Sequence, residues 1–161
     1  MATAFIALGS NLGDRQQFLA RAVDQIKEIP QSRLVHLSGW YETKPVGGPP
    51  QGLFLNGAAQ LRTELGPFEL LGSLQKIEQE LGRPSDHEPW ASRVIDLDLL
   101  FYDDLILHSL SLTLPHPRLH ERRFVLEPLH EIAPDWVHPT LKKSVKLLLQ
   151  ELIHAGRSSP E

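Results

Sequence analysis

Residues 93–102 constrain the fold of this chain more than any other stretch. Most of their side chains are branched or aromatic, which is typical of a β-strand. Because side chains alternate along a strand, Asp96 and Asp98 should project from one face, with their backbones roughly 7 Å apart. The apolar residues between and beside them should point to the opposite face and into a core: Ile95, Leu97 and Leu99. The stretch therefore predicts a half-buried strand with two carboxylates on its outer face.

Two interpretations fit this pair of carboxylates equally well. The strand could simply have an acidic outer face. Alternatively, two oxygen ligands at this separation suit a hard divalent cation such as Mg²⁺. Neighbouring like charges repel each other, and a hydrophobic strand gains nothing from them. The choice between a solvated face and a metal site therefore depends on the rest of the chain.

The composition restricts the class of protein. With 161 residues, the chain is expected to form a single domain over residues 1–161 with a sizeable core. A formal net charge of −4 argues against a general nucleic-acid binder, and the absence of cysteine excludes disulfides and thiolate metal sites. The first residues lack a basic segment, and their apolar run is too short for a membrane span. We expect a cytoplasmic monomer without nucleic-acid or membrane partners.

The order of apolar segments predicts the fold class. Strands are expected at 5–8, 34–42, 53–63 and 93–102, and helices at 14–28 and 67–81. This order predicts an α+β fold with a ferredoxin-like βαββαβ core, in which helices flank an antiparallel sheet in three α/β/α layers. We expect further helices at 118–132, broken at Pro128, and at 141–153, followed by a frayed tail over 155–161.

Two long loops and one tight turn are candidate functional segments. The loops, at 43–52 and 83–93, have no hydrophobic period, and loops of this kind often carry function. The second loop contains Trp90 and has Arg83 and Arg93 at its ends. The Gly-Ser-Asn turn at 9–11 could cradle a phosphate. It lacks the lysine and glycine spacing of a P-loop, which favours a plain strand-to-helix turn.

Three polar positions leave alternatives open. Asn56 lies among apolar strand residues, and its amide could either bond its own backbone or bind a ligand. His116 has proline on both sides, which fixes its backbone and favours a positioned side chain over a surface histidine. Gln75 and Glu78 are neighbours on an expected helix and are interpreted as a solvent-exposed pair.

These groups together favour chemistry on phosphates. Carboxylate-held Mg²⁺ with nearby arginines is what phosphoryl-type transfer needs, because such catalysis mainly positions groups and offsets charge on phosphate oxygens. The candidate arginines are Arg83, Arg93, Arg122 and Arg123, and flat faces for a planar heterocycle come from Phe54, Trp90 and Phe124. Without a P-loop, the set predicts a nucleotide-dependent transferase of an unusual kind.

Several motifs run in order along the chain to about residue 134. They are Ala-Leu-Gly-Ser-Asn-Leu-Gly-Asp at 7–14, Tyr-Glu-Thr-Lys-Pro-Val-Gly at 41–47, Phe-Leu-Asn at 54–56, Gln-Lys-Ile-Glu at 75–78, Gly-Arg at 82–83, Arg-Val-Ile-Asp-Leu-Asp-Leu-Leu at 93–100, Pro-His at 115–116, and Arg122, Phe124 and Leu-Glu-Pro-Leu at 126–129. By these motifs and their spacing the chain resembles the 6-hydroxymethyl-7,8-dihydropterin pyrophosphokinases of folate synthesis. The arginine-to-double-aspartate motif is the most specific of them.

The resemblance implies transfer of pyrophosphate from ATP to the hydroxymethyl group of the pterin, with release of AMP. It implies that Asp96 and Asp98 hold two Mg²⁺ ions and act in catalysis with Arg83 and Arg93. The implied ATP contacts are Gln75, Arg83, Trp90, Arg93, Leu99, Thr113, His116 and Arg122. The implied pterin contacts are Thr43, Val46, Gly47, Phe54, Asn56, Trp90 and Phe124, with the ring between the two phenylalanines. The alternative is a catalytically impaired pterin- and nucleotide-binding module of the same fold.

One loop departs from the family pattern. Members of the family have a second arginine where this chain has Ser85, a basic residue at Pro89, and Gly-Pro at positions 91–92, which are Ala-Ser here. The loop also gains Asp86 and Glu88. Anions in place of cations near a triphosphate should weaken the attraction for ATP. The departure bears on catalytic efficiency and less on the class of reaction.

Overall fold

The computed structural model describes residues 1–10, 14–43, 54–81 and 95–155, and its elements follow the predicted order. The core elements are β1 (Ala2–Ser10), α1 (Arg15–Lys27), β2 (Ser32–Leu37), β3 (Tyr41–Thr43), β4 (Phe54–Thr63), α2 (Pro67–Glu80) and β5 (Asp96–Tyr102). They are followed by β6 (Leu107–His108), β7 (Thr113–Leu114), the 3₁₀ turn η1 (Leu119–Glu121), α3 (Arg123–Ile132) and α4 (Val145–Ala155). Within the described ranges, no helix is long and apolar enough to cross a membrane.

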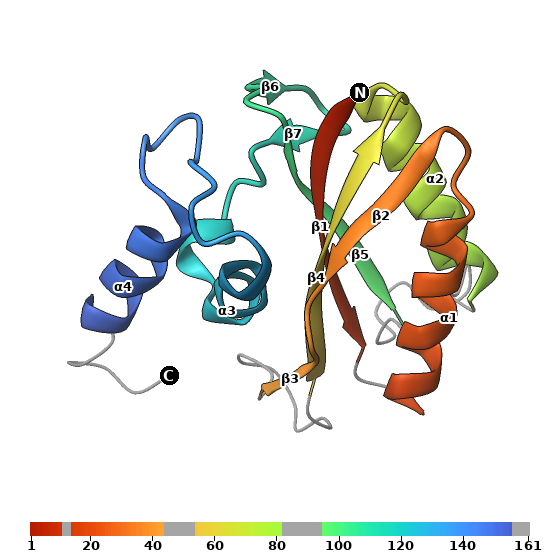
Figure 1. The fold of residues 1–161 in the computed structure, drawn as a ribbon, viewed down its shortest axis with the longest axis horizontal. Helices are drawn as coiled ribbons and strands as arrows, with labels where there is room; N and C mark the ends of the chain where they lie inside the picture. Colours follow the sequence, from red (N-terminus) through yellow and green to blue (C-terminus); the bar gives the residue numbers. More distant parts are fainter. Residues whose placement is uncertain (11–13, 44–53, 82–94, 156–161) are drawn as a thin grey trace.

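The central sheet is antiparallel and has five strands. Its order is β2-β4-β1-β5, and β3 pairs with β4 beyond the end of β2. The helices α1 and α2 cover one face, while α3 lies against the other face with α4 outside it (Figure 1). The α+β class and the predicted ferredoxin-like core in three layers are therefore confirmed.

The first helix shows how the sequence specifies its local structure. Asp14 is the N-cap of α1, and its side chain accepts a hydrogen bond of 3.1 Å from the backbone N–H of Gln17. The buried residues of α1 recur at helical spacing and face the sheet: Leu19, Ala22, Val23 and Ile26. Both the start and the apolar face of this helix agree with the prediction.

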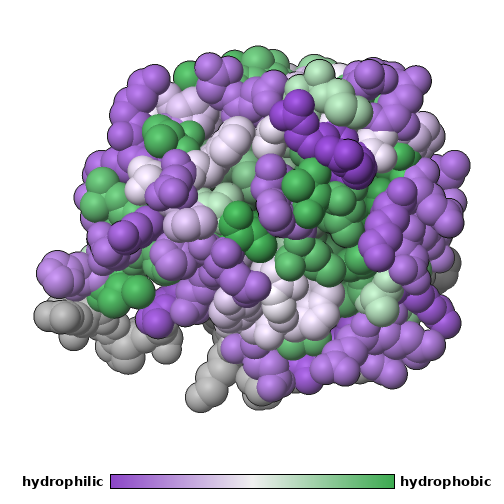
Figure 2. All heavy atoms as spheres, in the orientation of Figure 1, coloured by the Kyte–Doolittle hydropathy of each residue, from purple (hydrophilic) through white to green (hydrophobic). Residues whose placement is uncertain are grey.

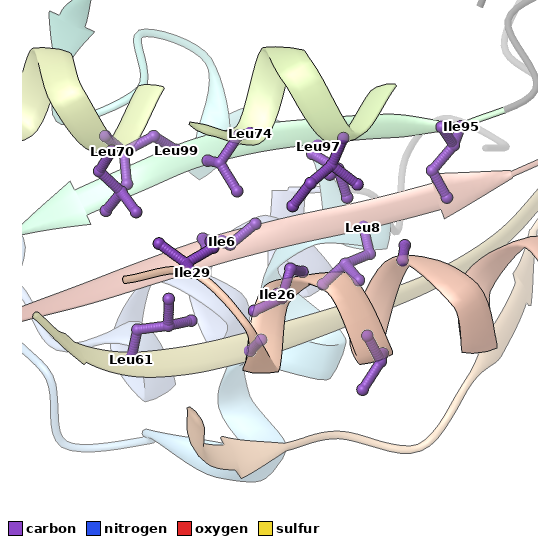
Figure 3. Close-up of a cluster of buried hydrophobic side chains, with 14 of the residues drawn as sticks. Ile6, Leu8, Ile26, Ile29, Leu61, Leu70, Leu74, Ile95, Leu97 and Leu99 are labelled. Carbon is purple, nitrogen blue, oxygen red and sulfur yellow. The ribbon is translucent and has the colours of Figure 1, made fainter. Parts of the chain in front are cut away.

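The larger core lies between the sheet and the two helices α1 and α2. Figure 3 shows side chains from β1, β5, α1 and α2 that point toward one another in this layer. Ile95, just before β5, and Leu97 and Leu99 on β5 are exposed by 0%, 4% and 3%. The predicted inward face of this strand is therefore confirmed, and the two aspartates point to the other face.

The smaller core lies between the other face of the sheet and the C-terminal helices. Phe5 packs edge-on against Trp136, with ring centroids 4.8 Å apart, and against Phe101 at 6.2 Å. On the outer surface, Figure 2 shows exposed hydrophobic side chains near the middle of this view and hydrophilic ones around most of the periphery. This second core attaches α3 to one part of the sheet face that carries the aspartates.

The predicted continuous strand over 34–42 is wrong. The register of β2 on β4 shifts between Leu34 and His36, and the chain leaves the sheet at Ser38 before it returns as β3. The hydroxyl of Ser38 accepts a hydrogen bond of 2.8 Å from Ala58 N. The Trp40 ring fills the space over Gly57, where a Cβ would overlap it. Packing of this indole overrides the local strand preference.

The predicted break at Pro128 is also wrong, because the interruption lies earlier. Arg122 has an extended backbone, with φ −116° and ψ 102°, and separates η1 from α3. Pro128 lies inside α3 on its buried face, beside Val125 and Leu129. Burial of this face offsets the hydrogen bond that proline cannot donate. The last helix begins at Val145 instead of 141, and residues 156–161 lie outside the described part.

A buried histidine supports the loop before α4. His138 is 5% exposed, and its Nδ1 accepts hydrogen bonds from the backbone N–H of Thr140 and of Leu141, at 3.2 and 3.0 Å. Burial lowers the pKa of His138 below its ordinary value of 6.5, and the nearby His120 lowers it further. The loop geometry therefore requires the neutral imidazole.

This histidine should make stability depend on pH. Because the pKa of His138 is lower in the folded protein, the unfolded chain binds more protons below pH 6.5. The stability contribution is complete above that value and declines as the pH falls. Protonation removes an acceptor worth about 1 kcal/mol, so Tm should fall by about 2–4 °C. His138→Asn, which keeps an acceptor that does not titrate, should reduce this fall in thermal melts. An equal fall in both proteins would contradict the assignment.

Candidate active site

The strand register brings predicted site residues into one row across the sheet. Asn56 lies opposite Gly9, and Gly9 lies opposite Asp96 on its other side. Directly opposed residues of antiparallel strands share a face, so the amide and the carboxylate project from the same side. Asp98 lies on this face in the next row, opposite Ala7. Asn56 lies in the segment of β4 that pairs with β3, so its row is at the end of the sheet where Figure 1 shows β3.

A glycine provides the space for the Asn56 amide. A Cβ on Gly9 would lie only 3.0 Å from Oδ1 of Asn56. Asn56 is 6% exposed, and its Nδ2 donates a hydrogen bond of 2.7 Å to the hydroxyl of Thr43 on β3. This bond joins two predicted pterin contacts and is not the local backbone bond that was one alternative for Asn56. The arrangement is a preorganised polar group at the edge of an apolar sheet.

Asp98 and Arg122 lie close enough to His116 for their charges to act on its imidazole. The backbone N–H of His116 donates to the carbonyl of Leu100 at 2.9 Å, which holds the loop against the strand. Burial lowers the pKa of His116 below 6.5, the nearby Asp98 raises it, and the nearby Arg122 lowers it. Its Nδ1 is buried and has no hydrogen-bond partner in the described part of the chain. This side chain is thus a positioned group and not a surface loop histidine.

The two aromatic residues of the expected pterin site come from different elements. Phe54 begins β4, pairs with Thr43 and lies on the face of Asn56, two residues away. Phe124 is the second residue of α3, and the Arg122 guanidinium carbon lies 5.9 Å from the centre of its ring. Both aromatic side chains are half-buried. Each could therefore offer a ring face to a planar ligand.

The predicted ATP contacts differ in what they can offer. The side chain of Leu99 is buried in the larger core, so it could meet ATP only through its backbone. Thr113 lies in β7, which packs against β5, and Gln75 is exposed on α2. The other residues of the predicted sites lie outside the described residues: Val46, Gly47, Arg83, Trp90 and Arg93. The departures at 85–92 also lie outside them.

Two carboxylates were missed or misinterpreted from the sequence. The exposed interpretation is wrong for Glu78, which is 4% exposed and accepts a 2.8 Å hydrogen bond from Leu97 N. Its place four residues after the buried Leu74, on the apolar stripe, could have indicated this. Glu131 accepts a 2.6 Å bond from the Tyr41 hydroxyl, which raises the pKa of Tyr41 to about 12. Local sequence offers no signal for that pairing.

The carboxylates on the site face fit a cation that arrives with a phosphate. Asp96 is half-buried and Asp98 is exposed, so oxygen ligands are available. The described ranges contain no group of three or more His, Cys, Asp or Glu side chains that could hold a metal. Mg²⁺ is commonly held by one or two carboxylates, with waters and substrate phosphates as its other ligands. The donor set therefore fits Mg²⁺ bound together with a nucleotide.

Comparison with known proteins identifies the family of this chain. Residues 5–134 match the family model of 7,8-dihydro-6-hydroxymethylpterin-pyrophosphokinase (HPPK). The chain belongs to the HPPK family. It is 41% identical over 154 residues to the 2-amino-4-hydroxy-6-hydroxymethyldihydropteridine pyrophosphokinase of Haemophilus influenzae, covering 96% of each chain. It is 46% identical to the Bacillus subtilis enzyme of that name over 130 residues, which is 81% of this chain and 77% of that one.

Solved structures show the same HPPK fold. The crystal structure of wild-type Plasmodium falciparum HPPK-DHPS with pteroate has a TM-score of 0.78 and 13% identity to this chain. The match covers 98% of this chain and 45% of that one. The chain therefore spans under half of the longer protein. At this identity the likeness supports the fold alone, while family membership rests on the sequence matches.

Proposed function

We infer that this member of the HPPK family transfers pyrophosphate from ATP to the hydroxymethyl group of 6-hydroxymethyl-7,8-dihydropterin in folate biosynthesis. The observation that carries this inference is the family match over residues 5–134, which includes the paired aspartates of β5. Those residues lie on the sheet face that also holds Asn56, so phosphate and pterin groups can be brought to one place. This retention of site residues disfavours the catalytically impaired alternative.

The phosphate side of the proposed site is built on β5 and the segments beside it. We propose that Asp96 and Asp98 would hold two Mg²⁺ ions that, when bound, offset charge on the phosphate oxygens. Arg122 offers a fixed positive charge near His116. The remaining ATP contacts are proposed at Gln75, Arg83, Trp90, Arg93, Leu99 and Thr113. Arg83 and Arg93 are the proposed catalytic arginines, because transfer of this kind relies on fixed cations.

The pterin side of the proposed site is built on β3, β4 and α3. The Asn56 amide would hydrogen-bond the edge of the heterocycle, because its bond to the Thr43 hydroxyl holds it in place and Gly9 leaves room for it. The ring would lie between Phe54 and Phe124. The remaining proposed contacts are Val46, Gly47 and Trp90. The planar ligand would thus be positioned beside the phosphate site.

The proposed reaction is one displacement at phosphorus. The hydroxymethyl oxygen forms a bond to the β-phosphorus of ATP, the bond from that phosphorus to the bridging oxygen of the α-phosphate breaks, and AMP leaves with the bond electrons. The hydroxyl proton is released. We assign no dedicated general base, and the chain's role is to orient the two substrates and exclude competing water.

The decisive assay mixes the protein with ATP, Mg²⁺ and 6-hydroxymethyl-7,8-dihydropterin. We expect equal amounts of AMP and the pterin diphosphate, separated by ion-exchange chromatography. Formation of ADP, or of no product, would contradict the proposed function. Binding of both ligands by calorimetry without AMP would support the impaired alternative. A single domain over 1–161, a monomeric state and a cytoplasmic location stay predictions.

Replacing Gly9 by alanine should impair pterin binding selectively. The new methyl group would press against Oδ1 of Asn56, and overpacking of this kind costs about 1–3 kcal/mol. We expect KM for the pterin to rise about tenfold or more, with KM for ATP changed less than about threefold. Steady-state kinetics with each substrate varied in turn measures both constants.

Gly57→Ala is the matched control for this substitution. Its added methyl group would meet the Trp40 ring on the opposite face of the sheet. It should therefore lower Tm without a selective change in pterin KM. If the two variants affect pterin KM equally, the role assigned to the Gly9 space is wrong.

A further inference from the structure

Within the described residues, the strand that carries the aspartates has a neighbouring strand on one side only. In the described part of the sheet, β5 pairs only with β1. Along an antiparallel edge strand, alternate residues direct their backbone N–H and C=O groups away from the neighbouring strand. A buried N–H of this kind requires another partner, because an unsatisfied one is costly. The group that accepts a hydrogen bond from the backbone N–H of Leu97, between Asp96 and Asp98, therefore influences the position of both carboxylates.

Glu78 provides that partner at Leu97. Its Oε2 lies 2.8 Å from Leu97 N, and the Glu78 residue is only 4% exposed. Leu97 packs into the core under α2, so Glu78 approaches the strand from the helix side, while the aspartates project from the other face. A carboxylate that accepts from a backbone N–H makes a stronger bond than a neutral acceptor. Glu78 thus holds the backbone N–H of Leu97, the residue that lies between the two aspartates.

We propose that Glu78 is a positioning residue for the metal-binding aspartates, acting through the backbone at Leu97. This inference rests on the proposed function, in which Asp96 and Asp98 hold Mg²⁺ with ATP. Mutual repulsion tends to separate these two carboxylates until cations neutralise them. The Glu78 bond resists that separation, because it fixes the backbone at Leu97, the residue that joins the two aspartates. The spacing of the oxygen ligands is then preset before the nucleotide arrives.

Two conservative variants separate the hydrogen bond from the charge. Glu78→Gln keeps the length and an acceptor oxygen but loses the charge, whereas Glu78→Asp keeps the charge but withdraws it by one methylene group. If the hydrogen bond positions the aspartates, the Mg²⁺ concentration for half-maximal activity should rise about tenfold in E78D and less than about threefold in E78Q. If Glu78 acts only as a nearby charge, the order of the two variants is reversed, and the proposal is overturned.

Tyr102→Phe is the control for a merely structural effect. The Tyr102 hydroxyl donates to the carbonyl of Leu65 at 2.5 Å, so this bond joins the far end of β5 to the segment before α2. Its loss should lower Tm without shifting the Mg²⁺ dependence. An equal Mg²⁺ shift in Y102F and E78D would mean that general loosening of β5 explains the result, and would overturn the proposal.

Hydrogen exchange tests the geometry without metal or activity. In the metal-free protein, the Leu97 amide should exchange at least about tenfold faster in E78D than in the unmodified protein, with the Leu8 amide on β1 as a reference. Unchanged Leu97 exchange would overturn the proposal. A fully active Asp98→Ala variant, by contrast, would show that the metal assignment itself has failed, whatever the exchange rate at Leu97.

Discussion

Replacing Asp98 by alanine is expected to lower Mg²⁺-dependent AMP release by at least about a hundredfold, because loss of one charged group at the phosphate site weakens transition-state stabilisation. The fold should persist, since Asp98 is exposed and lies opposite Ala7 on β1. AMP release measured across a Mg²⁺ titration gives both the rate and the apparent affinity for the cation. A variant that stays fully active would show that the metal assignment is wrong.

Asp104→Ala is the matched control for Asp98→Ala. Asp104 is an exposed acid in the turn after the same strand, outside the proposed site. Its loss should change AMP release by less than about twofold, as expected for an exposed residue away from special contacts. If both variants lose activity equally, the cause is the general removal of a negative charge and not the loss of a specific metal ligand.

A second measurement checks, in the absence of substrates, that Asp98 lies close to His116. Asp98 raises the pKa of His116, opposing burial and Arg122, which lower it. The D98A substitution should therefore lower the pKa of His116 further, as followed by NMR titration of the imidazole. An unchanged value would mean that the two side chains are not close enough to interact.

The acid pair illustrates what a period-two pattern can predict. The apolar side chains of β5 are buried in the larger core, and the two aspartates share the opposite face, as the alternation required. The pattern could not decide between a solvated face and a metal site. The metal site stays a proposal, and it is supported by residues far along the chain, at Asn56 and His116, which only the folded sheet brings near the aspartates.

The predictions of secondary structure were wrong where tertiary packing overrides the local preference for a strand or a helix. The strand expected at 34–42 is interrupted because the Trp40 ring packs over Gly57. The helix expected at 118–132 is divided at Arg122, while Pro128 lies within a continuous buried helix. The link from Tyr41 to Glu131 joins residues 90 positions apart, and no local pattern predicts such a contact. Local propensity is a weak guide at positions of this kind.

Arg122 should be the second residue with a large effect on catalysis. It is the only described arginine that acts on His116 and contacts Phe124. Fixed arginines at phosphate-transfer sites contribute large rate factors, and we expect Arg122→Ala to lower kcat/KM for ATP by about a hundredfold or more. Arg122→Lys should recover only part of this loss, because lysine lacks the planar fork that binds two phosphate oxygens. Initial rates with ATP varied at saturating pterin measure the effect.

Arg123 is the control, because it is adjacent to Arg122 in the sequence and carries the same charge but lies outside the proposed site. Arg123 forms an ion pair with Glu127 at 3.4 Å, and pairs of this kind contribute only about 0.3–0.5 kcal/mol. Arg123→Ala should therefore change kcat/KM by less than about threefold. The two variants should also differ at His116: loss of Arg122 removes a charge that lowers the imidazole pKa, so that pKa should rise, whereas loss of Arg123 should leave it unchanged. Equal effects of both substitutions on kcat/KM would contradict the proposed role of Arg122. Two adjacent residues of the same charge should differ in effect only if one of them makes a contact specific to the site.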